Sequence, residues 1–430
     1  MQGIRTAKGF VILVALLLST TSHSESLEDA WRTALAVDHS LRAAHLTAAS
    51  EEARLDAAKS RRLPTLNVEA GYLSKSDPSI VDISELNLPA VEQFQADEKE
   101  SLSYGANVSV PVYTGGRISQ GINAANHQLE AAQSETATAI QNLKMRVAEA
   151  YITVLRTHRA RTVAESQVMS LEAHAEDTEH LFEQGLTDKN ALLSARVALA
   201  DAKHQSLQAC NDVDVAQAAY NRILGRPLTQ AAAPDEVELV LPDDDLEDLT
   251  LRALQQRPSI SILSHRMEAF QAQAAAERSV RRPQAAISGG YNHTENEFQA
   301  HEGIWSVKLG LEWKLFDGGT ANHTSAAIIR KADALSESRA DLASRITLEV
   351  REAWLDLNES RERIAVTQQA VSQAEENLKV AVNLFKAGMA THTEVLEAER
   401  LRTTTYTNNN NAIYDAALAG LRLRRTLGEL

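Results

Sequence analysis

Cysteine, aromatic residues and long apolar runs are all scarce in this sequence. Its 430 residues include a single cysteine, Cys210, so no disulfide bond within the chain can stabilise the fold. Aromatic residues make up 4% of the chain although hydrophobic residues make up 44%, so the apolar content is mainly Ala, Leu and Val, as in long, closely packed helices. Beyond the N-terminus no run reaches about 18 apolar residues, which excludes a helical membrane span.

Positive charge is also scarce, and this limits the expected partners. Residues 1–24 are predicted to be a secretory signal peptide, because Arg5 and Lys8 precede the apolar stretch Phe10–Ser19 and small polar residues follow. The loss of these two cations takes the formal net charge from −15 to −17. A chain this acidic is not expected to bind nucleic acid.

The residue patterns of enzymes are missing as well. There is no phosphate-binding loop, no cysteine nucleophile and no triad pattern, so we expect neither enzymatic activity nor a cofactor. The segment HAEDTEH, His174–His180, has a metal-like composition, but its residues spread around one helix, and we expect a solvated helix face there. No metal site is therefore predicted from the sequence.

The chain contains a tandem duplication. Two offsets, 219 and then 203 residues, align identical pairs: Gly71 and Tyr72 with Gly290 and Tyr291, Gly115 and Gly116 with Gly318 and Gly319, and Leu224 and Gly225 with Leu427 and Gly428. We therefore predict a first repeat over residues 25–225, a linker over 226–245 and a second repeat over 246–430.

The hydrophobic period changes in the same order within each repeat. Residues 27–62 predict one or two helices, which Pro64 ends. The period then becomes two, most clearly in WSVKLGLEWKLF, residues 305–316, and each repeat is expected to hold two such strands. The polar faces of these strands include four charged residues, Glu69, Lys308, Glu312 and Lys314.

A helical period follows the second strand of each repeat. Residues 118–182 contain no proline, and apolar residues recur every seven positions, as in coiled coils. A break at EQGLTDKN, residues 183–190, or at KAGMATHT, residues 386–393, precedes a second helix. Each repeat is thus predicted to contain a long antiparallel helical hairpin.

The four strands indicate how the chain assembles. A single strand of this kind is also compatible with an ordinary half-buried sheet, but all four follow the pattern and no soluble sheet partner is encoded elsewhere, which favours strands that face lipid. Four strands cannot close a barrel, so several copies must share one, with eight strands from two copies or twelve from three. The polar faces would line a water-filled interior, which predicts a channel.

Several segments resemble the TolC family of outer-membrane channels, which serve drug efflux and type I secretion. They are RRLPTLNVEAGY, VRRPQAAISGGY, PVYTGGR, KLFDGGT, LFEQGLTDKNALLSA and LFKAGMATHTEVLEA. The resemblance implies a mainly α-helical fold with membrane β-strands, in which a homotrimer shares a 12-stranded barrel in outer-membrane lipid and extends a helical tunnel into the periplasm. It further implies the exit duct of a tripartite system, opened by a periplasmic adaptor (membrane fusion) protein and an inner-membrane transporter of RND or ABC type.

The resemblance also implies roles for individual residues. Each glycine pair, Gly115 with Gly116 and Gly318 with Gly319, is expected where a strand turns into a tunnel helix, a junction that residues with a Cβ resist. Glu394 and Glu397 match an acidic pair that faces the pore in similar proteins, and three-fold symmetry would make them two carboxylate rings at a constriction. The hairpin tips are expected to receive the adaptor through Gly185, Leu186, Gly388 and Met389.

One departure from the family concerns the closed state. In similar proteins polar links between neighbouring tip helices hold the channel closed, but the matching positions here are Ala191, Phe385 and Ala390, whose side chains cannot form such links. We predict that the closed state is held less tightly or by other tip residues, namely Asp188, Lys189 or His392.

Two other protein classes also contain long helical hairpins. A periplasmic adaptor carries one hairpin flanked by small β domains, and a periplasmic coiled-coil scaffold without a pore lacks amphipathic strands between its hairpins. The duplicated order of strand, strand and hairpin favours the channel over both. Drug efflux and protein secretion are equally compatible with this order.

Overall fold

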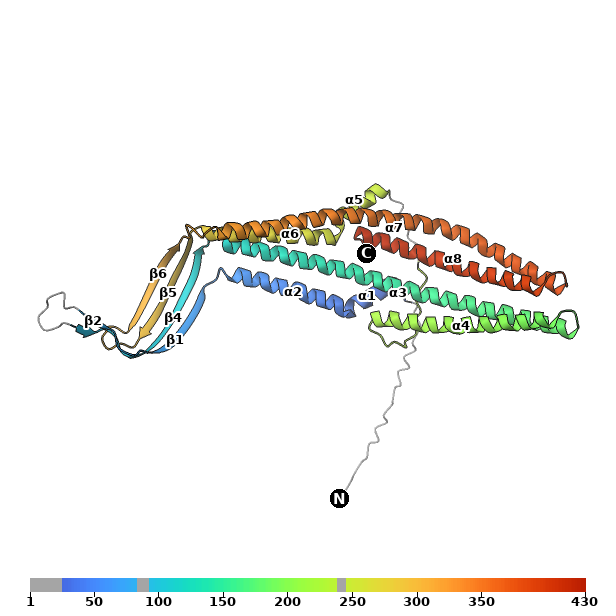
Figure 1. Cartoon of the computed structure of the whole chain (residues 1–430), viewed down its shortest axis with the longest axis horizontal. Coiled ribbons are helices and arrows are strands. Elements are labelled where there is room, and N and C mark those ends of the chain that lie inside the picture. The colour runs from blue at the N-terminus through green and yellow to red at the C-terminus, as the bar shows by residue number, and fades with distance from the viewer. Residues whose placement is uncertain (1–24, 83–92, 238–244) are drawn as a thin grey trace, which may run out of the picture. The chain divides into compact units, whose positions relative to one another are not determined.

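The computed structural model describes residues 25–82, 93–237 and 245–430 (Figure 1). The predicted signal peptide and residues 238–244 of the predicted linker lie outside the described residues. The chain divides into two compact units. We call the unit of residues 37–146, 240–363 and 415–430 the sheet unit, and that of residues up to 36, 147–239 and 364–414 the hairpin unit.

A four-stranded antiparallel sheet forms one end of the sheet unit (Figure 1). Its order is β1-β4-β5-β6, so that β1 and β6 are the edges, and the bounds are β1 Thr65–Ser74, β4 Glu100–Tyr113, β5 Gln284–Thr294 and β6 Gly303–Glu312. The two central strands come from different repeats and pair with Val108 opposite Gly289. The alternating sequence therefore forms four strands as predicted, but β6 ends at Glu312, so residues 313–316 of the predicted strand, Lys314 among them, lie outside it.

A second, shorter pair of strands was not predicted. Strands β2 (Ile80–Asp82) and β3 (Gln93–Gln95) pair antiparallel within the polar segment that only the first repeat contains. Three residues are too few for a hydrophobic period to be recognised, so these strands could not be predicted from the sequence.

The apolar face of β6 is uncovered. Trp305, Val307, Leu309 and Leu311 alternate along the strand and are each at least 70% exposed. Because a soluble sheet buries one face, these side chains indicate a face that meets another apolar phase.

Helices make up the rest of the sheet unit. Their bounds are α2 His39–Ser60, α5 Leu246–Gln256, α6 Pro258–Arg278 and the 3₁₀ turn η2 Ser279–Arg281, with the first parts of α3 (Arg117–Glu183) and α7 (Thr320–Lys386) and the last part of α8 (His392–Leu427). Buried Leu249, Val350, Leu357 and Leu423 form a core between α5, α7 and α8. Among the described helices, none has the length and hydropathy needed to cross a membrane.

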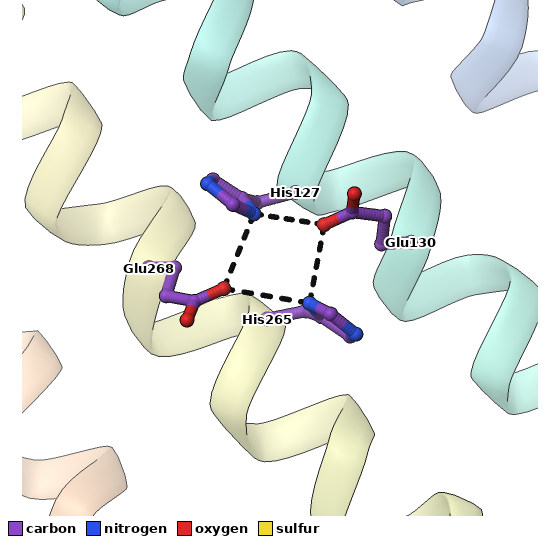
Figure 2. Close-up of side chains that lie close together, drawn as sticks. All are labelled: His127, Glu130, His265 and Glu268. Carbon is purple, nitrogen blue, oxygen red and sulfur yellow. Dashed lines mark hydrogen bonds and ion pairs between the residues drawn. The ribbon is translucent and has the colours of Figure 1, made fainter.

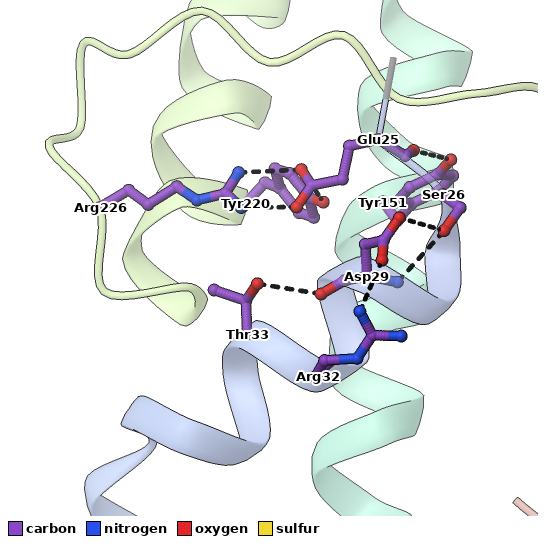
Figure 3. A network of polar contacts seen from close by, with 8 residues as sticks. All are labelled: Glu25, Ser26, Asp29, Arg32, Thr33, Tyr151, Tyr220 and Arg226. Carbon is purple, nitrogen blue, oxygen red and sulfur yellow. Dashed lines mark hydrogen bonds and ion pairs between the residues drawn. The ribbon is translucent and has the colours of Figure 1, made fainter. Parts of the chain in front are cut away.

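The hairpin unit contains α1 (Leu27–Val37), α4 (Lys189–Ile223) and the remaining lengths of α3, α7 and α8. Tyr151 of α3 and Tyr220 of α4 are buried with their rings edge to face at 6.0 Å. Both tyrosines donate hydrogen bonds to Glu25, the first described residue, which is part of the polar network in Figure 3. Tyr220 donates a hydrogen bond to the Glu25 carboxylate at 2.9 Å, and Tyr151 donates to its carbonyl at 2.7 Å.

Arg226 completes this network. Its guanidinium contacts both carboxylate oxygens of Glu25 at 2.5 and 2.8 Å, and these hydrogen bonds raise the pKa of Arg226. Burial raises the pKa of both tyrosines, so their hydroxyls stay protonated and continue to donate. The segment that follows the predicted signal peptide is thereby attached to the hairpin.

Candidate functional site at the helical hairpin tips

The two hairpin tips share one backbone geometry. At the first tip Gly185 has φ 71°, its N–H donates to Phe182 O, and the Leu186 N–H donates to Leu181 O, both at 2.9 Å. This pair of hydrogen bonds is the Schellman ending, which needs a residue in the left-handed region and therefore favours glycine. The second tip repeats it with Gly388, also at φ 71°.

Each returning helix starts on a capping side chain. Asp188 accepts a hydrogen bond from the Ala191 N–H at 2.7 Å and caps α4. Thr391 occupies the matching position and accepts a weaker bond, 3.4 Å, from the Glu394 N–H. The sequence folds in this way because a glycine ends one helix and, three residues later, an Asp or Thr begins the next.

A pocket of about 560 Å³ lies between the two tips. Its lining includes Asp188 and Ala191 from the first tip and Phe385, Gly388 and His392 from the second. Leu186 and Met389, which follow the tip glycines, are 70% and 71% exposed. Each tip therefore carries an exposed apolar side chain.

The predicted aperture residues already have partners within the chain. Glu394 accepts a hydrogen bond from the Thr391 hydroxyl at 3.1 Å. Glu397 receives two hydrogen bonds from Arg400, at 2.6 and 2.9 Å, which hold the pKa of its carboxyl below the ordinary value. Both groups are exposed, and Arg400 offsets part of the negative charge that the sequence assigned to this position.

The three polar residues proposed as closed-state links make only local contacts in the described chain. Asp188 is used as the helix cap, and His392 lies 3.5 Å from the hydroxyl of its neighbour Thr393. Lys189 is exposed and makes no side-chain hydrogen bond or ion pair with the described residues. Within the described residues, none of the three joins one hairpin to the other.

Other residues, which the sequence reasoning missed, do join the two hairpins. Lys386 at the end of α7 lies 2.9 Å from the carboxylate of Asp177 on α3. One turn earlier on α3, His174 packs against Phe385 with ring centroids 5.0 Å apart. His174 is 5% exposed, so the expectation of a solvated face for HAEDTEH is wrong at this residue. Burial lowers the pKa of His174 to about 4, with the charge of His392 as a smaller cause.

A buried charged network extends these links along the same helices. Glu399 of α8 is 1% exposed, receives a hydrogen bond from Ser170 at 2.8 Å and pairs with Arg402 at 2.8 Å. Arg402 in turn donates to Ser166 at 3.1 Å. The two serines lie more than two hundred residues before Glu399 and Arg402 in the chain, so no local sequence pattern could have identified these contacts.

The remaining predicted residues lie on the sheet and its junctions. Each glycine pair follows a strand and precedes a long helix, with φ values of 64° and 97° before α3 and 67° and 85° before α7. A Cβ on Gly115 would meet Arg282 Cβ at 2.6 Å and Ser279 O at 2.9 Å, so this position has both a conformational and a steric need for glycine. The charged residues predicted for the barrel lumen are all exposed: Glu69, Lys308 and Glu312 lie in strands, and Lys314 follows the end of β6.

Comparison with known proteins adds to this geometry. A family described as "Outer membrane efflux protein" matches residues 31–226 and 249–429. Outer membrane protein TolC of Vibrio cholerae is 26% identical over 98% of this chain and 94% of its own length. Cobalt-zinc-cadmium resistance protein CzcC of Cupriavidus metallidurans is 24% identical over 78% and 79%, respectively. The outer membrane protein VceC of Vibrio cholerae superposes with a TM-score of 0.78 at 19% identity, covering 94% of this chain and 96% of that one.

Proposed function

Because the chain belongs to the outer membrane efflux protein family, whose match spans both repeats, we propose that it is the exit duct of a three-part export system. Membership makes it an outer-membrane channel protein and not an enzyme. The finer proposal is a homotrimer that works with a periplasmic adaptor and an inner-membrane transporter. It goes beyond the family assignment and is supported by the sheet and by the tips.

The observation that carries the proposal is the open, uncovered sheet. Strands β1 and β6 are edges, and the apolar row of β6 is exposed. Open edges are not tolerated in lipid, so β6 of one copy is expected to pair with β1 of the next until the barrel closes. Three copies give twelve strands, with Glu69, Lys308, Glu312 and Lys314 turned to the lumen.

The tips supply the proposed contact with the adaptor. Gly185 and Gly388 leave open space where a side chain would stand, because nothing lies within 4 Å of a Cβ built there. Beside them Leu186 and Met389 are exposed. Because glycine has no side chain, a partner helix can approach the backbone closely there and contact the neighbouring apolar side chain.

We propose that links between the hairpins hold the tips closed. The Asp177 to Lys386 pair and the Glu399, Arg402 and Ser170 network join α3 to α7 and α8. These contacts are candidates in addition to Asp188, Lys189 and His392, whose predicted role concerns contacts between neighbouring copies. Opening of the tips would require at least the ion pair between Asp177 and Lys386 to separate. Because an ion pair in contact with solvent contributes little free energy, a bound adaptor could displace it.

The aperture proposal retains Glu394 and Glu397 as carboxylate rings. Arg400 pairs with Glu397, so the Glu397 ring carries less negative charge than three free carboxylates, whereas the Glu394 ring has no such cation beside it in the described chain. We expect modest cation selectivity and millimolar block by Ca²⁺, for which carboxylate oxygens are suitable ligands.

Single-channel recording in a planar bilayer tests the function. The wild type is compared with Glu394→Gln/Glu397→Gln and with the control Glu51→Gln/Asp56→Asn, which removes two acids from α2, each also paired with a cation three residues on. We expect cation-selective steps in the wild type and the control, and a loss of selectivity and of Ca²⁺ block in the tip variant. A detergent-solubilised protein that light scattering shows to be monomeric, or selectivity unchanged in the tip variant, would overturn the trimer or the aperture, respectively.

A further inference from the structure

Two histidines and two glutamates converge between α3 and α6 of the sheet unit. His127 and Glu130 lie three residues apart on α3, and His265 and Glu268 lie three residues apart on α6. This spacing places each pair on one face of its helix. Figure 2 shows the two pairs facing each other, with the donor atoms at the corners of a four-sided figure.

The contacts around this figure are short. His127 Nδ1 lies 2.8 Å from Glu130 Oε2 and 3.2 Å from Glu268 Oε2. His265 Nδ1 lies 3.2 Å from Glu130 Oε2 and 3.4 Å from Glu268 Oε2. A square with edges of this size has its centre about 2.2 Å from each corner, which is close to the lengths of zinc bonds to histidine nitrogen and carboxylate oxygen. All four donors are therefore at ligand distance from one common point.

We propose that His127, Glu130, His265 and Glu268 form a site for one divalent transition-metal ion. Two imidazole nitrogens with two carboxylate oxygens suit Zn²⁺, Ni²⁺ or Cu²⁺, whereas Ca²⁺ and Mg²⁺ prefer oxygen ligands alone. Two carboxylates neutralise the double positive charge of the ion. The bound ion would join α3 to α6, two helices from different repeats.

The histidine orientation points to a shared cation. The two rings are nearly parallel, with centroids 6.3 Å apart and planes at 18°, and both turn Nδ1 toward the same two carboxylates. An unprotonated Nδ1 facing a carboxylate oxygen is repelled, so each Nδ1 must carry either a proton or a metal ion. His265 Nδ1 is buried and makes no hydrogen bond of good geometry within the described chain, although Glu130 and Glu268 lie next to it. A metal ion at the centre satisfies both rings at once.

Neighbouring residues hold the ligands in place. Asn126 donates a hydrogen bond at 2.9 Å to Glu130 Oε1, the oxygen that does not face the histidines, and so orients the carboxylate. Arg266, adjacent to His265, pairs with Glu135 of α3 and fastens the two helices beside the site. The four side chains remain 30 to 45% exposed, so an ion can reach them from solvent.

The repeat-equivalent positions lack these ligands. At the offset of 203 residues, His127 and Glu130 align with Arg330 and Asp333, which pair with each other at 3.1 Å. At the offset of 219 residues, His265 aligns with Leu46. The cluster is therefore a feature of one helix contact and not of the duplicated scaffold.

Titration calorimetry on the untagged, chelator-treated full-length protein tests the site. We expect ZnCl₂ to bind at one ion per chain, and His127→Gln/His265→Gln to weaken binding at least about 100-fold, because half of the ligands are lost. The control is His180→Gln/Glu183→Gln, which removes an identically spaced pair from α3. This pair is exposed, its two groups lie 3.9 Å apart, and within the described residues no second pair faces it. This control should bind Zn²⁺ like the wild type.

A spectroscopic readout separates ligation from folding. Electron paramagnetic resonance of the protein loaded with Cu²⁺ should show two nitrogen ligands in the wild type and one in His265→Gln, while circular dichroism without metal confirms that the variants fold. Zinc binding equal in the wild type and in His127→Gln/His265→Gln, or a copper spectrum without nitrogen ligands, would overturn the proposal. The cluster would then be a set of proton-dependent ion pairs.

Discussion

The two hairpin tips have the same backbone but different side chains. Both end a helix at a glycine with φ 71°, both close with the same two hydrogen bonds, and both restart on a capping side chain three residues later. Yet the third and sixth positions of the returning helix are Ala191 and Ser194 at the first tip and Glu394 and Glu397 at the second. Duplication has therefore preserved the turn, and the two copies have diverged in charge.

Burial differs between the tips as well. Phe385 is 5% exposed and packs on His174, whereas its counterpart Phe182 is 37% exposed. The position that matches His174 in the second repeat is Asn377. The second tip thus carries the buried Phe385 and the two glutamates, and the first hairpin supplies His174, against which Phe385 packs.

The largest effect on the free energy of unfolding is expected when the side chain of the buried Phe385 is removed. Phe385→Ala should lower the free energy of unfolding by about 3 kcal/mol, because it leaves a cavity beside His174, while Phe182→Ala should cost less than about 1 kcal/mol. Denaturant unfolding of the detergent-solubilised protein, followed by circular dichroism, measures both. Equal losses of free energy would show that the two phenylalanines contribute equally to stability and that the two tips do not differ in packing.

The largest pH dependence at the tips should come from His174 of the first hairpin. The folded pKa of His174, about 4, lies below the unfolded value of about 6.5, so the unfolded chain binds a proton that the folded chain does not. The free energy of unfolding should therefore fall as the pH drops from about 6.5 to about 4, by on the order of 2 kcal/mol.

His174→Asn, which introduces the residue of the second repeat, tests this prediction. Asn does not titrate, so the variant should lose most of the acid-induced change in the thermal midpoint. The control His204→Asn removes an exposed histidine from α4 and should retain it. The neighbouring charges of Asp177 and His392 remain in both variants, so a change that survives in His174→Asn would have to be assigned to them.

The elements could be predicted from the sequence because they rest on local patterns. The period of two locates the long strands, and Gly185 and Gly388 mark where each long helix ends. The contacts between elements could not be predicted in the same way. His174 looks like a solvated residue until Phe385, more than two hundred residues later, is placed against it.

The histidine and glutamate cluster was missed for a related reason. Each half, HQLE at His127 and HRME at His265, is an unremarkable spacing on a helix surface. The only available signal was the H-x-x-E pattern, which also occurs at His180 and Glu183 and so did not single out this pair of helices. Their meeting depends on the packing of α6 against α3, which hydrophobic periodicity alone does not specify.

The tip glycines should be equivalent despite the different side chains around them. Gly185→Ala and Gly388→Ala should each cost about 1 kcal/mol, since both residues are left-handed and neither Cβ would meet another atom within 4 Å. The control Gly121→Ala, within α3 and also in open space, should instead stabilise the protein by up to about 1 kcal/mol. Unequal costs at the two tips, measured by denaturant unfolding, would indicate that one glycine is already under additional strain.

The smallest effect concerns the caps, and it tests the difference in charge directly. Asp188→Thr should change the free energy of unfolding by less than about 0.5 kcal/mol, because Thr also accepts a hydrogen bond at this position. The reciprocal Thr391→Asp keeps a cap but removes the hydroxyl that donates to Glu394, and it places two carboxylates three residues apart at a cost of about 0.5 kcal/mol. Salt screens such repulsion, so the cost of Thr391→Asp should shrink in high salt and that of Asp188→Thr should not. If neither cost responds to salt, Glu394 does not interact electrostatically with its cap, and the difference in charge between the tips would serve the pore rather than the helix.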